Sequence, residues 1–144
     1  MPNLSQQFVF ALGTGTVAVP GVLIPSTAIP PTGSVANTAS IFLSDGLKGD
    51  GYYGASDGLH TVTYTVGASF KGSINMQGTL AVSPSDSDWF DIDNTVRSWN
   101  TTTTVTTTTT NYVNFVGNFV WVRAKVSRNY DLPLGSVIAL SYNH

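Results

Sequence analysis

Strict alternation of apolar and polar residues is the feature that most constrains what this chain can fold into. From residue 61 to residue 66, threonine alternates with valine or tyrosine at every position. Successive side chains of a β-strand point to opposite faces, so this period of two predicts a half-buried strand over residues 59–66. The same period recurs in residues 72–82, where Gly78 interrupts it, and in residues 119–126. Gly78 predicts a bulge or a close backbone contact.

The composition excludes the helical alternatives. The chain has 144 residues with no Glu and only three Lys, the two residues that usually cover exposed helix faces. It has 19 Thr and 15 Ser instead. Threonine favours strands because its branched Cβ stiffens χ1. These counts argue against a helical bundle, a coiled coil or a helix-rich α/β enzyme, and they favour an all-β fold.

Turn signals at intervals of about 8–12 residues separate further short strand candidates. Gly117-Asn118 is a plausible two-residue hairpin turn before the segment 119–126. From residue 36 onward the pattern gives seven or eight such strands, which predict an antiparallel β-sandwich, jelly-roll-like, with no helix required. The remaining candidate strands are residues 8–12, 16–19, 22–24, 40–43, 89–92, 112–116 and 136–142.

Residues 1–35 differ from the regular part of the chain, residues 36–144, which we take as the sandwich domain. Five of the seven prolines fall in this segment. Proline lacks the donor that a sheet interior needs and favours extended neighbours. The segment is therefore either an extended N-terminal arm laid on another subunit or a set of edge strands of the same domain. As an arm, it would offer five apolar side chains to a subunit interface: Phe8, Phe10, Leu12, Leu23 and Ile24.

The charges exclude several classes of partner. The formal net charge is −2 and the six basic residues are scattered, so no phosphate-binding track is present and no nucleic-acid partner is expected. No apolar run approaches 18 residues, so we expect no membrane partner. Charged residues make up 10% of the chain, against about 25% in a typical soluble domain. Because surface charge keeps proteins soluble, so few charges would leave a free monomer prone to association. This favours a surface largely covered by neighbouring molecules.

No catalytic or metal-binding motif is predicted, and we expect neither an enzyme nor a cofactor. Asp86, Asp88, Asp91 and Asp93 could supply oxygen ligands to calcium, but the run lacks the glycine turn and terminal Glu of an EF-hand. Two histidines without cysteine cannot make a zinc site unless aspartate contributes. His60 has no nucleophile motif beside it. We expect the aspartates to act as turn residues.

Two polar features keep binding hypotheses open. Tyr52, Tyr53 and Trp99 fall in predicted loops, where aromatic rings either stack on sugars or cap the ends of a sandwich. Residues 101–110 hold nine Thr and one Val. Such a strand is polar on both faces, so nothing in its pattern fixes the register. It predicts an edge strand or an inter-subunit sheet.

Several phrases of the chain together resemble virion structural proteins of tailed bacteriophages, cyanophages in particular. The resemblance covers about residues 45–144 and implies a β-sandwich module located on the virion. No catalytic signature is part of it. The phrases are KGDGYYG at 48–54, SDGLHTV at 56–62, GTLA at 78–81, DWF at 88–90, GNFVWVRA at 117–124 and YNH at 142–144.

This resemblance implies a non-enzymatic function on the particle. The first expectation is a capsid decoration (cement) protein that stabilises the head by binding neighbouring subunits of the major capsid protein or other virion proteins. A homo-oligomer is expected, with a trimer favoured. The alternative is an adsorption module of a tail or neck fibre that binds host-surface glycan through its loop aromatics. A plain structural subunit of the tail or baseplate is a third possibility.

Overall fold

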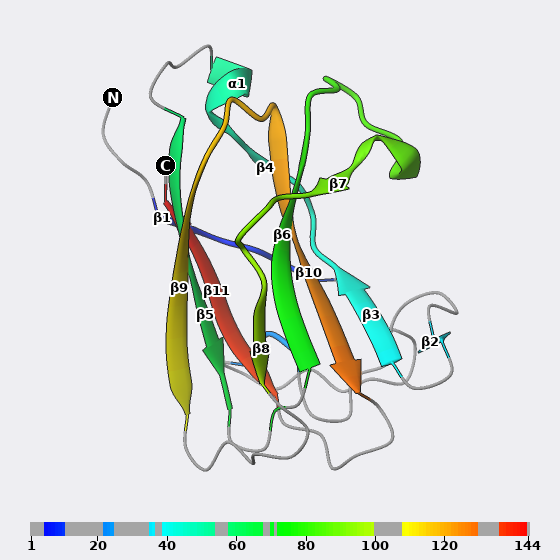
Figure 1. The fold of residues 1–144 in the computed structure, drawn as a ribbon, viewed down its shortest axis with the longest axis vertical. Helices are drawn as coiled ribbons and strands as arrows, with labels where there is room; N and C mark the ends of the chain where they lie inside the picture. Colours follow the sequence, from blue (N-terminus) through cyan, green and yellow to red (C-terminus); the bar gives the residue numbers. More distant parts are fainter. Residues whose placement is uncertain are drawn as a thin grey trace.

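The computed structural model describes residues 5–10, 22–24, 35–36, 39–53, 58–67, 70, 72–99, 108–129 and 136–143. Two antiparallel sheets pack face to face around one apolar core (Figure 1). The four-stranded sheet has the order β1-β11-β5-β9. Its strands are β1 (Ser5–Gln7), β11 (Val137–Asn143), β5 (Leu59–Val66) and β9 (Thr109–Val116).

The seven-stranded sheet has the order β2-β3-β10-β6-β7, with β4 also paired to β10 and β8 also paired to β6. One helical turn, α1 (Asp50–Tyr53), and one 3-10 turn, η1 (Asp86–Asp88), lie between strands, although the sequence required no helix. The strands are β2 (Val35–Ala36), β3 (Ala39–Leu43), β4 (Leu47–Lys48), β6 (Gly72–Thr79), β7 (Phe90–Asp91), β8 (Arg97–Trp99) and β10 (Trp121–Asn129).

The connectivity is that of a jelly roll. We count β3 with β4, which both pair with β10, as one strand, and β7 with β8, which both pair with β6, as another. Setting aside the two-residue β2, the two sheets then hold strands 1-8-3-6 and 2-7-4-5 in chain order. This is the jelly-roll arrangement of two four-strand layers. The predicted all-β, jelly-roll-like sandwich is confirmed.

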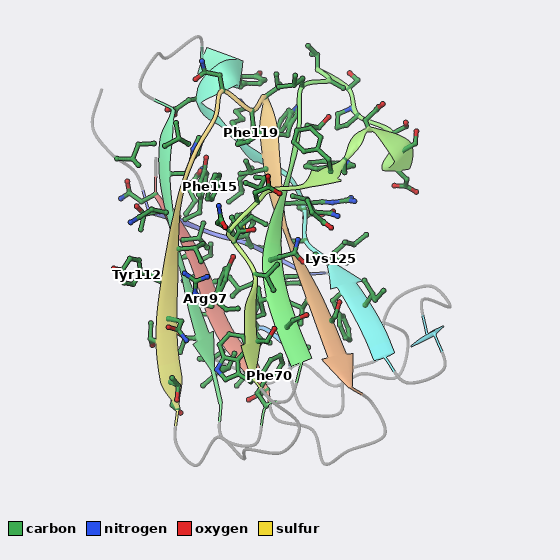
Figure 2. All side chains as sticks on the ribbon, in the orientation of Figure 1. Phe70, Arg97, Tyr112, Phe115, Phe119 and Lys125 are labelled. Carbon is green, nitrogen blue, oxygen red and sulfur yellow. The ribbon has the colours of Figure 1, made fainter. Side chains whose placement is uncertain are left out.

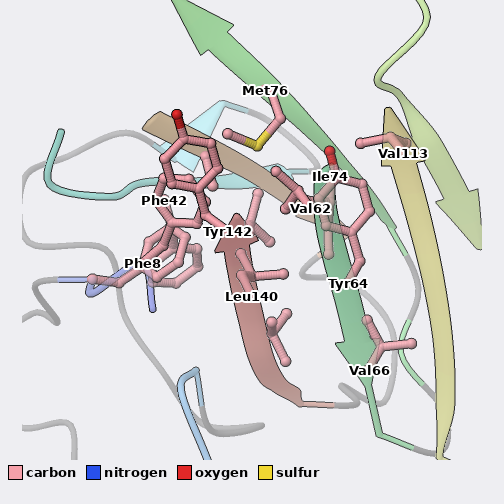
Figure 3. Close-up of a cluster of buried hydrophobic side chains, with 14 of the residues drawn as sticks. Phe8, Phe42, Val62, Tyr64, Val66, Ile74, Met76, Val113, Leu140 and Tyr142 are labelled. Atoms are coloured by element: carbon pink, nitrogen blue, oxygen red, sulfur yellow. The ribbon is translucent and has the colours of Figure 1, made fainter. Parts of the chain in front are cut away.

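The alternation seen in the sequence fills the core. In β5, His60, Val62, Tyr64 and Val66 are fully buried, whereas the threonines between them are half-buried on the outer face. β10 repeats the pattern by burying alternate residues from position 122 to 126, although it begins at Trp121 rather than at 119. Figure 3 shows the β5 and β11 side chains meeting those of the opposite sheet.

The described parts of residues 1–35 lie on the sandwich itself. β1 pairs with β11 at the edge of the four-stranded sheet, and single bridges join Phe10 to Ser44 and Ile24 to Val137. Phe8 lies with its ring 5.6 Å from that of Tyr142 (Figure 3). Three of the five side chains expected at a subunit interface, Phe8, Phe10 and Ile24, are buried in the core of this chain.

That burial corrects the interface prediction for these three residues, because the chain's own sheets already cover them. The sequence pattern could not separate the two cases, since an apolar extended segment looks the same whichever molecule covers it. Leu23 is partly buried against the core, and Leu12 lies outside the described residues. Removing residues 1–35 would therefore also remove core side chains and strand β1.

A close backbone contact joins the glycine-rich segment after β4 to the turn before β10. Gly49 and Gly51 donate hydrogen bonds to the carbonyls of Val120 and Phe119, each at 2.9 Å. A Cβ at either glycine would lie 2.3 Å from a carbonyl oxygen of the 118–119 backbone. Only glycine permits this approach, so the segment 48–53 is shaped to receive the turn at 117–120.

One buried threonine joins the two sheets. The Thr95 hydroxyl accepts from the backbone N–H of Met76 in β6 at 3.1 Å and donates to the Ile92 carbonyl at 2.7 Å. The Thr95 carbonyl accepts from the phenol of Tyr64 in β5 at 3.0 Å. Burial raises the pKa of Tyr64 well above its ordinary value of 10, so the phenol stays a donor. Thr95 thereby satisfies buried polar groups of both layers.

Candidate functional site

The outer face of the four-stranded sheet carries no charge. None of the residues of β1, β5, β9 and β11 is Asp, Glu, Lys or Arg. Cross-strand hydrogen bonds between uncharged side chains cover the face: Thr61 Oγ1 to Asn114 Oδ1 at 2.7 Å, Thr65 to Thr110 at 3.0 Å, and Gln7 to Ser141 at 3.0 Å. Because no ion has to be desolvated, this face can be buried against another protein at low cost.

Two large side chains break the polar covering of this face at β9. Tyr112 is 61% exposed and Val116 is 71% exposed. Figure 2 shows Tyr112 projecting away from the sandwich on the outer side of β9. Aromatic and aliphatic side chains in such positions supply the apolar contact that a polar face lacks.

The outer face of the seven-stranded sheet carries a hydrogen-bonded charged network instead. Arg123 Nε donates to Gln77 Oε1 at 2.8 Å, and Gln77 Nε2 donates to Asp91 Oδ1 at 2.9 Å. Asn75 Nδ2 reaches the same Asp91 oxygen at 3.1 Å. The Gln77 hydrogen bond, then that of Asn75 and the charge of Lys125, hold the pKa of Asp91 below its ordinary value of 3.8. The network is internally satisfied, which favours a structural role.

Two tryptophans hold the neighbouring loop against this network. The Arg123 guanidinium stacks on the Trp89 ring, 4.3 Å from the ring centre. Burial lowers the pKa of Arg123, and the charge of Asp86 opposes that change. Trp121 donates its indole N–H to the Val82 carbonyl at 2.9 Å. These contacts fasten the segment between β6 and β7 onto β10.

An open cleft of about 530 Å³ lies between β9 and the chain formed by β7 and the three residues that follow it. Phe90, which is 43% exposed, and Phe119 form its aromatic wall, with ring centres 5.8 Å apart. Gly78 and Gly117 make room for the Phe119 ring, since a Cβ at either would lie within 2.7 Å of it. Figure 2 places Phe115 and Phe119 together near one end of the sandwich. The polar wall is formed by Asp91, Asp93, Asn94 and Asn114.

The predicted glycan-contact residues are not brought together at this cleft. Tyr52 is 43% exposed and its ring packs at 5.3 Å from that of Trp121, with the Lys48 ammonium 4.4 Å from the ring centre. Trp99 is buried in β8, edge-on to Phe70 at 5.3 Å. The prediction for Trp99 is wrong, because a three-residue strand carries it into the core. The Tyr53 side chain lies outside the described residues.

The aspartate run does local structural work. The Asp88 carboxylate accepts from the Ser85 backbone N–H at 2.7 Å and from its hydroxyl at 3.1 Å, which closes the η1 turn. Asp91 belongs to the Arg123 network, and Asp93 lines the cleft. In the part of the chain that the structure describes, no three His, Asp or Glu side chains cluster as metal ligands. His60 stacks on Phe115, with ring centres 4.7 Å apart in the core.

Sequence reasoning missed the cleft and the uncharged face. Two signals pointed to the cleft: Gly78, expected to mark a close contact, and the Gly117-Asn118 turn that precedes Phe119. The sequence showed part of the uncharged face, because threonines alternate with the buried residues of β5. It could not show how far the face extends, since that depends on which strands lie next to β5.

Comparison with known proteins finds no relative of this chain among protein families or curated proteins. Among the described helices, none is long and apolar enough to cross a membrane.

Proposed function

We propose that this chain is a non-enzymatic structural protein of a bacteriophage particle, and that it acts as a capsid decoration protein. It stabilises the head by laying the uncharged face of its four-stranded sheet on neighbouring capsid subunits. The observation that carries this proposal is that face, free of ionised groups across four adjacent strands. The resemblance of several sequence phrases to phage virion proteins supports the location. Jelly rolls also occur in viral capsid domains, which supports the role by analogy of fold.

The size of the face argues for several copies acting together. The three-residue β1 and three strands of seven or eight residues, about 4.8 Å apart, together cover roughly 400 Å². A standard protein interface buries about 800 Å² per partner, so one copy would bind weakly. A homo-oligomer would add its faces through avidity.

Fractionated virions test the proposal. Particles of the phage that encodes the chain are purified, heads are separated from tails, and the chain is quantified in each fraction by mass spectrometry. The proposal expects many copies in the head fraction. Absence from purified particles, or confinement to tails, contradicts decoration.

A matched pair of variants tests the face. Thr63→Lys places an ammonium in the middle of the uncharged face, whereas Ser127→Lys places one at a similarly half-buried position on the outer face of β10. An unpaired charge buried at a contact costs about 3 kcal/mol or more, which corresponds to over 100-fold in affinity. Thr63→Lys should therefore abolish binding to heads that lack the protein. Equal loss in Ser127→Lys would refute the choice of face.

The cleft favours a second candidate function, adsorption to host-surface glycan by a tail or neck module. An aromatic wall facing carboxylate and amide groups offers stacking and hydrogen bonds together, as sugar-binding sites require. Lectin domains are also jelly rolls. Phe90→Ala should abolish binding on a glycan array, while Tyr52→Ala, an equally exposed aromatic outside the cleft, should leave it intact. No saturable binding by the wild-type chain would count against adsorption.

A further inference from the structure

The edges of the two sheets differ in length. Among the described strands, three of the four edges are formed by strands of two or three residues: β1 in one sheet, and β2 and β7 with β8 in the other. The fourth edge is β9, which has eight residues. Short edge strands, charges, prolines and bulges protect natural sheets from pairing with other chains. β9 has no charge and no proline, and it pairs with β5 over all eight residues without a register shift.

The direction of the β9 backbone groups defines the open side of this edge. The Gly117 N–H donates to the Gly58 carbonyl at 3.0 Å, so position 117 faces β5. Backbone groups alternate along a strand, and Thr110, Tyr112, Asn114 and Val116 therefore direct theirs away from β5. The Tyr112 carbonyl accordingly accepts from a group outside the sheet, Arg97 Nη2 at 3.2 Å.

We infer that β9 pairs antiparallel with β9 of a second copy of this chain, about a two-fold axis at Val113. In this register Tyr112 lies opposite the partner's Asn114, and Thr110 lies opposite the partner's Val116. The four residues whose backbone groups point away from β5 then form ladder hydrogen bonds with the partner strand, about eight bonds in total. The two four-stranded sheets become one continuous sheet with a single uncharged face.

A second copy fits this edge better than a different protein. An isologous contact needs a surface that is complementary to itself, and like charges opposite each other would prevent it. The residues of β9 have none, and the cation bonded to its edge, Arg97, contacts the Tyr112 carbonyl. The pairing also covers Tyr112 and Val116, the two most exposed large side chains of the strand. Arg97 does not block the ladder, because a carbonyl oxygen has two lone pairs and can accept from both Arg97 and a partner N–H.

Single cysteines test the register, since the chain contains no cysteine of its own. The two Val113 residues face each other as a non-hydrogen-bonded pair, whose Cα separation of about 4.5 Å suits a disulfide. Val113→Cys should give a disulfide-linked dimer under mild oxidation. Val116→Cys is the matched control: its thiol would be far more exposed but lies opposite Thr110. Equal or preferential crosslinking through position 116 would overturn the register.

Mass measurement tests the pairing itself. By light scattering, the wild-type chain should have twice its mass of 15.2 kDa at tens of micromolar. Asn114→Pro removes an outward N–H without touching the β5 ladder and should give a folded monomer, with folding checked by circular dichroism. If that variant does not fold, Tyr112→Lys with Asn114→Lys puts like charges opposite each other and should also give monomers. Thr63→Lys, on the same face but inside the sheet, should stay dimeric.

A wild-type monomer or trimer overturns the inference, as does a folded Asn114→Pro dimer. The pairing does not depend on where the chain works. Thr63→Lys separates the two proposals, because it should block head binding while leaving the dimer intact.

Discussion

The two sheets bury the same kind of inward face but present opposite outer faces. The strands of the four-stranded sheet contain no ionisable carboxylate, lysine or arginine. On the outer face of the seven-stranded sheet, Gln77 joins Arg123 to Asp91 by hydrogen bonds. Asn75 also donates to Asp91, and the charge of Lys125 acts on the same carboxylate. The charged groups satisfy one another and hold the β6–β7 segment in place. The inward-facing residues of the strands therefore specify the fold. The outward-facing residues distinguish the two sheets: those of the seven-stranded sheet bond to one another, whereas those of the four-stranded sheet are suited to contact with another protein.

The largest loss of stability is expected from a substitution of Thr95, which bonds to groups of both sheets. Thr95→Val keeps the shape but leaves the Met76 N–H and the Ile92 carbonyl without their hydroxyl partner. Each unsatisfied buried group costs about 1–3 kcal/mol, so we expect the two groups to lower the free energy of unfolding by about 2–6 kcal/mol. Urea denaturation followed by tryptophan fluorescence and circular dichroism measures it. A loss below 1 kcal/mol would show that the Thr95 hydroxyl does not fasten the segment after β7 to β6.

A second variant tests whether the turn at 117–120 depends on the glycines that receive it. Gly49→Ala would place a Cβ 2.3 Å from the Phe119 carbonyl oxygen, and backbone cannot move away as a side chain can. We expect a loss of about 1–3 kcal/mol by thermal or urea unfolding. Gly46→Ala is the control, because its Cβ would meet Trp89 and Trp121 at ordinary contact distances of 3.4 and 3.5 Å. Equal losses in both variants would refute the steric argument.

The charged face should also respond to acid. The folded-state pKa of Asp91 is lower than its unfolded value, so its stabilisation is complete above about pH 5 and is lost as the pH falls through the folded-state pKa. Asp91→Asn should therefore flatten the dependence of the free energy of unfolding on pH between pH 5 and 3. Gln77→Met, which removes the main donor but keeps the carboxylate, should flatten it in part. A slope unchanged in both variants contradicts the assignment.

The smallest effect is expected on the uncharged face. Thr61→Val removes the 2.7 Å hydrogen bond to Asn114, but both groups are open to water. We expect a change within about 0.5 kcal/mol by urea denaturation. A loss above 1 kcal/mol would mean that the face contributes to folding and is not simply available for contact.

The sequence predicted the strands whose period is long enough to read. β5, β6 and β10 follow from alternation over eight or more positions, although β6 ends at Thr79 and leaves Leu80 and Val82 exposed. Gly78 correctly marked a close contact. Trp99 was misplaced because β8 is too short to show a period. Phe8 and Ile24 were assigned to a subunit interface because an apolar residue in a sequence does not indicate whether its own chain or another chain covers it. The cleft unites residues 90–94 with 114–119, a proximity that depends on strand order.

The main-chain fit of Gly49 and Gly51 against the 118–119 backbone has a practical consequence for engineering. A corner without side-chain volume to spare is a poor place to graft a tag or to randomise residues for display. The stretch from Leu80 to Asp88, largely open to solvent and anchored at Trp121, is a better insertion point. An epitope inserted there would decorate the charged side of the sandwich and leave the neutral side free to engage whatever it meets.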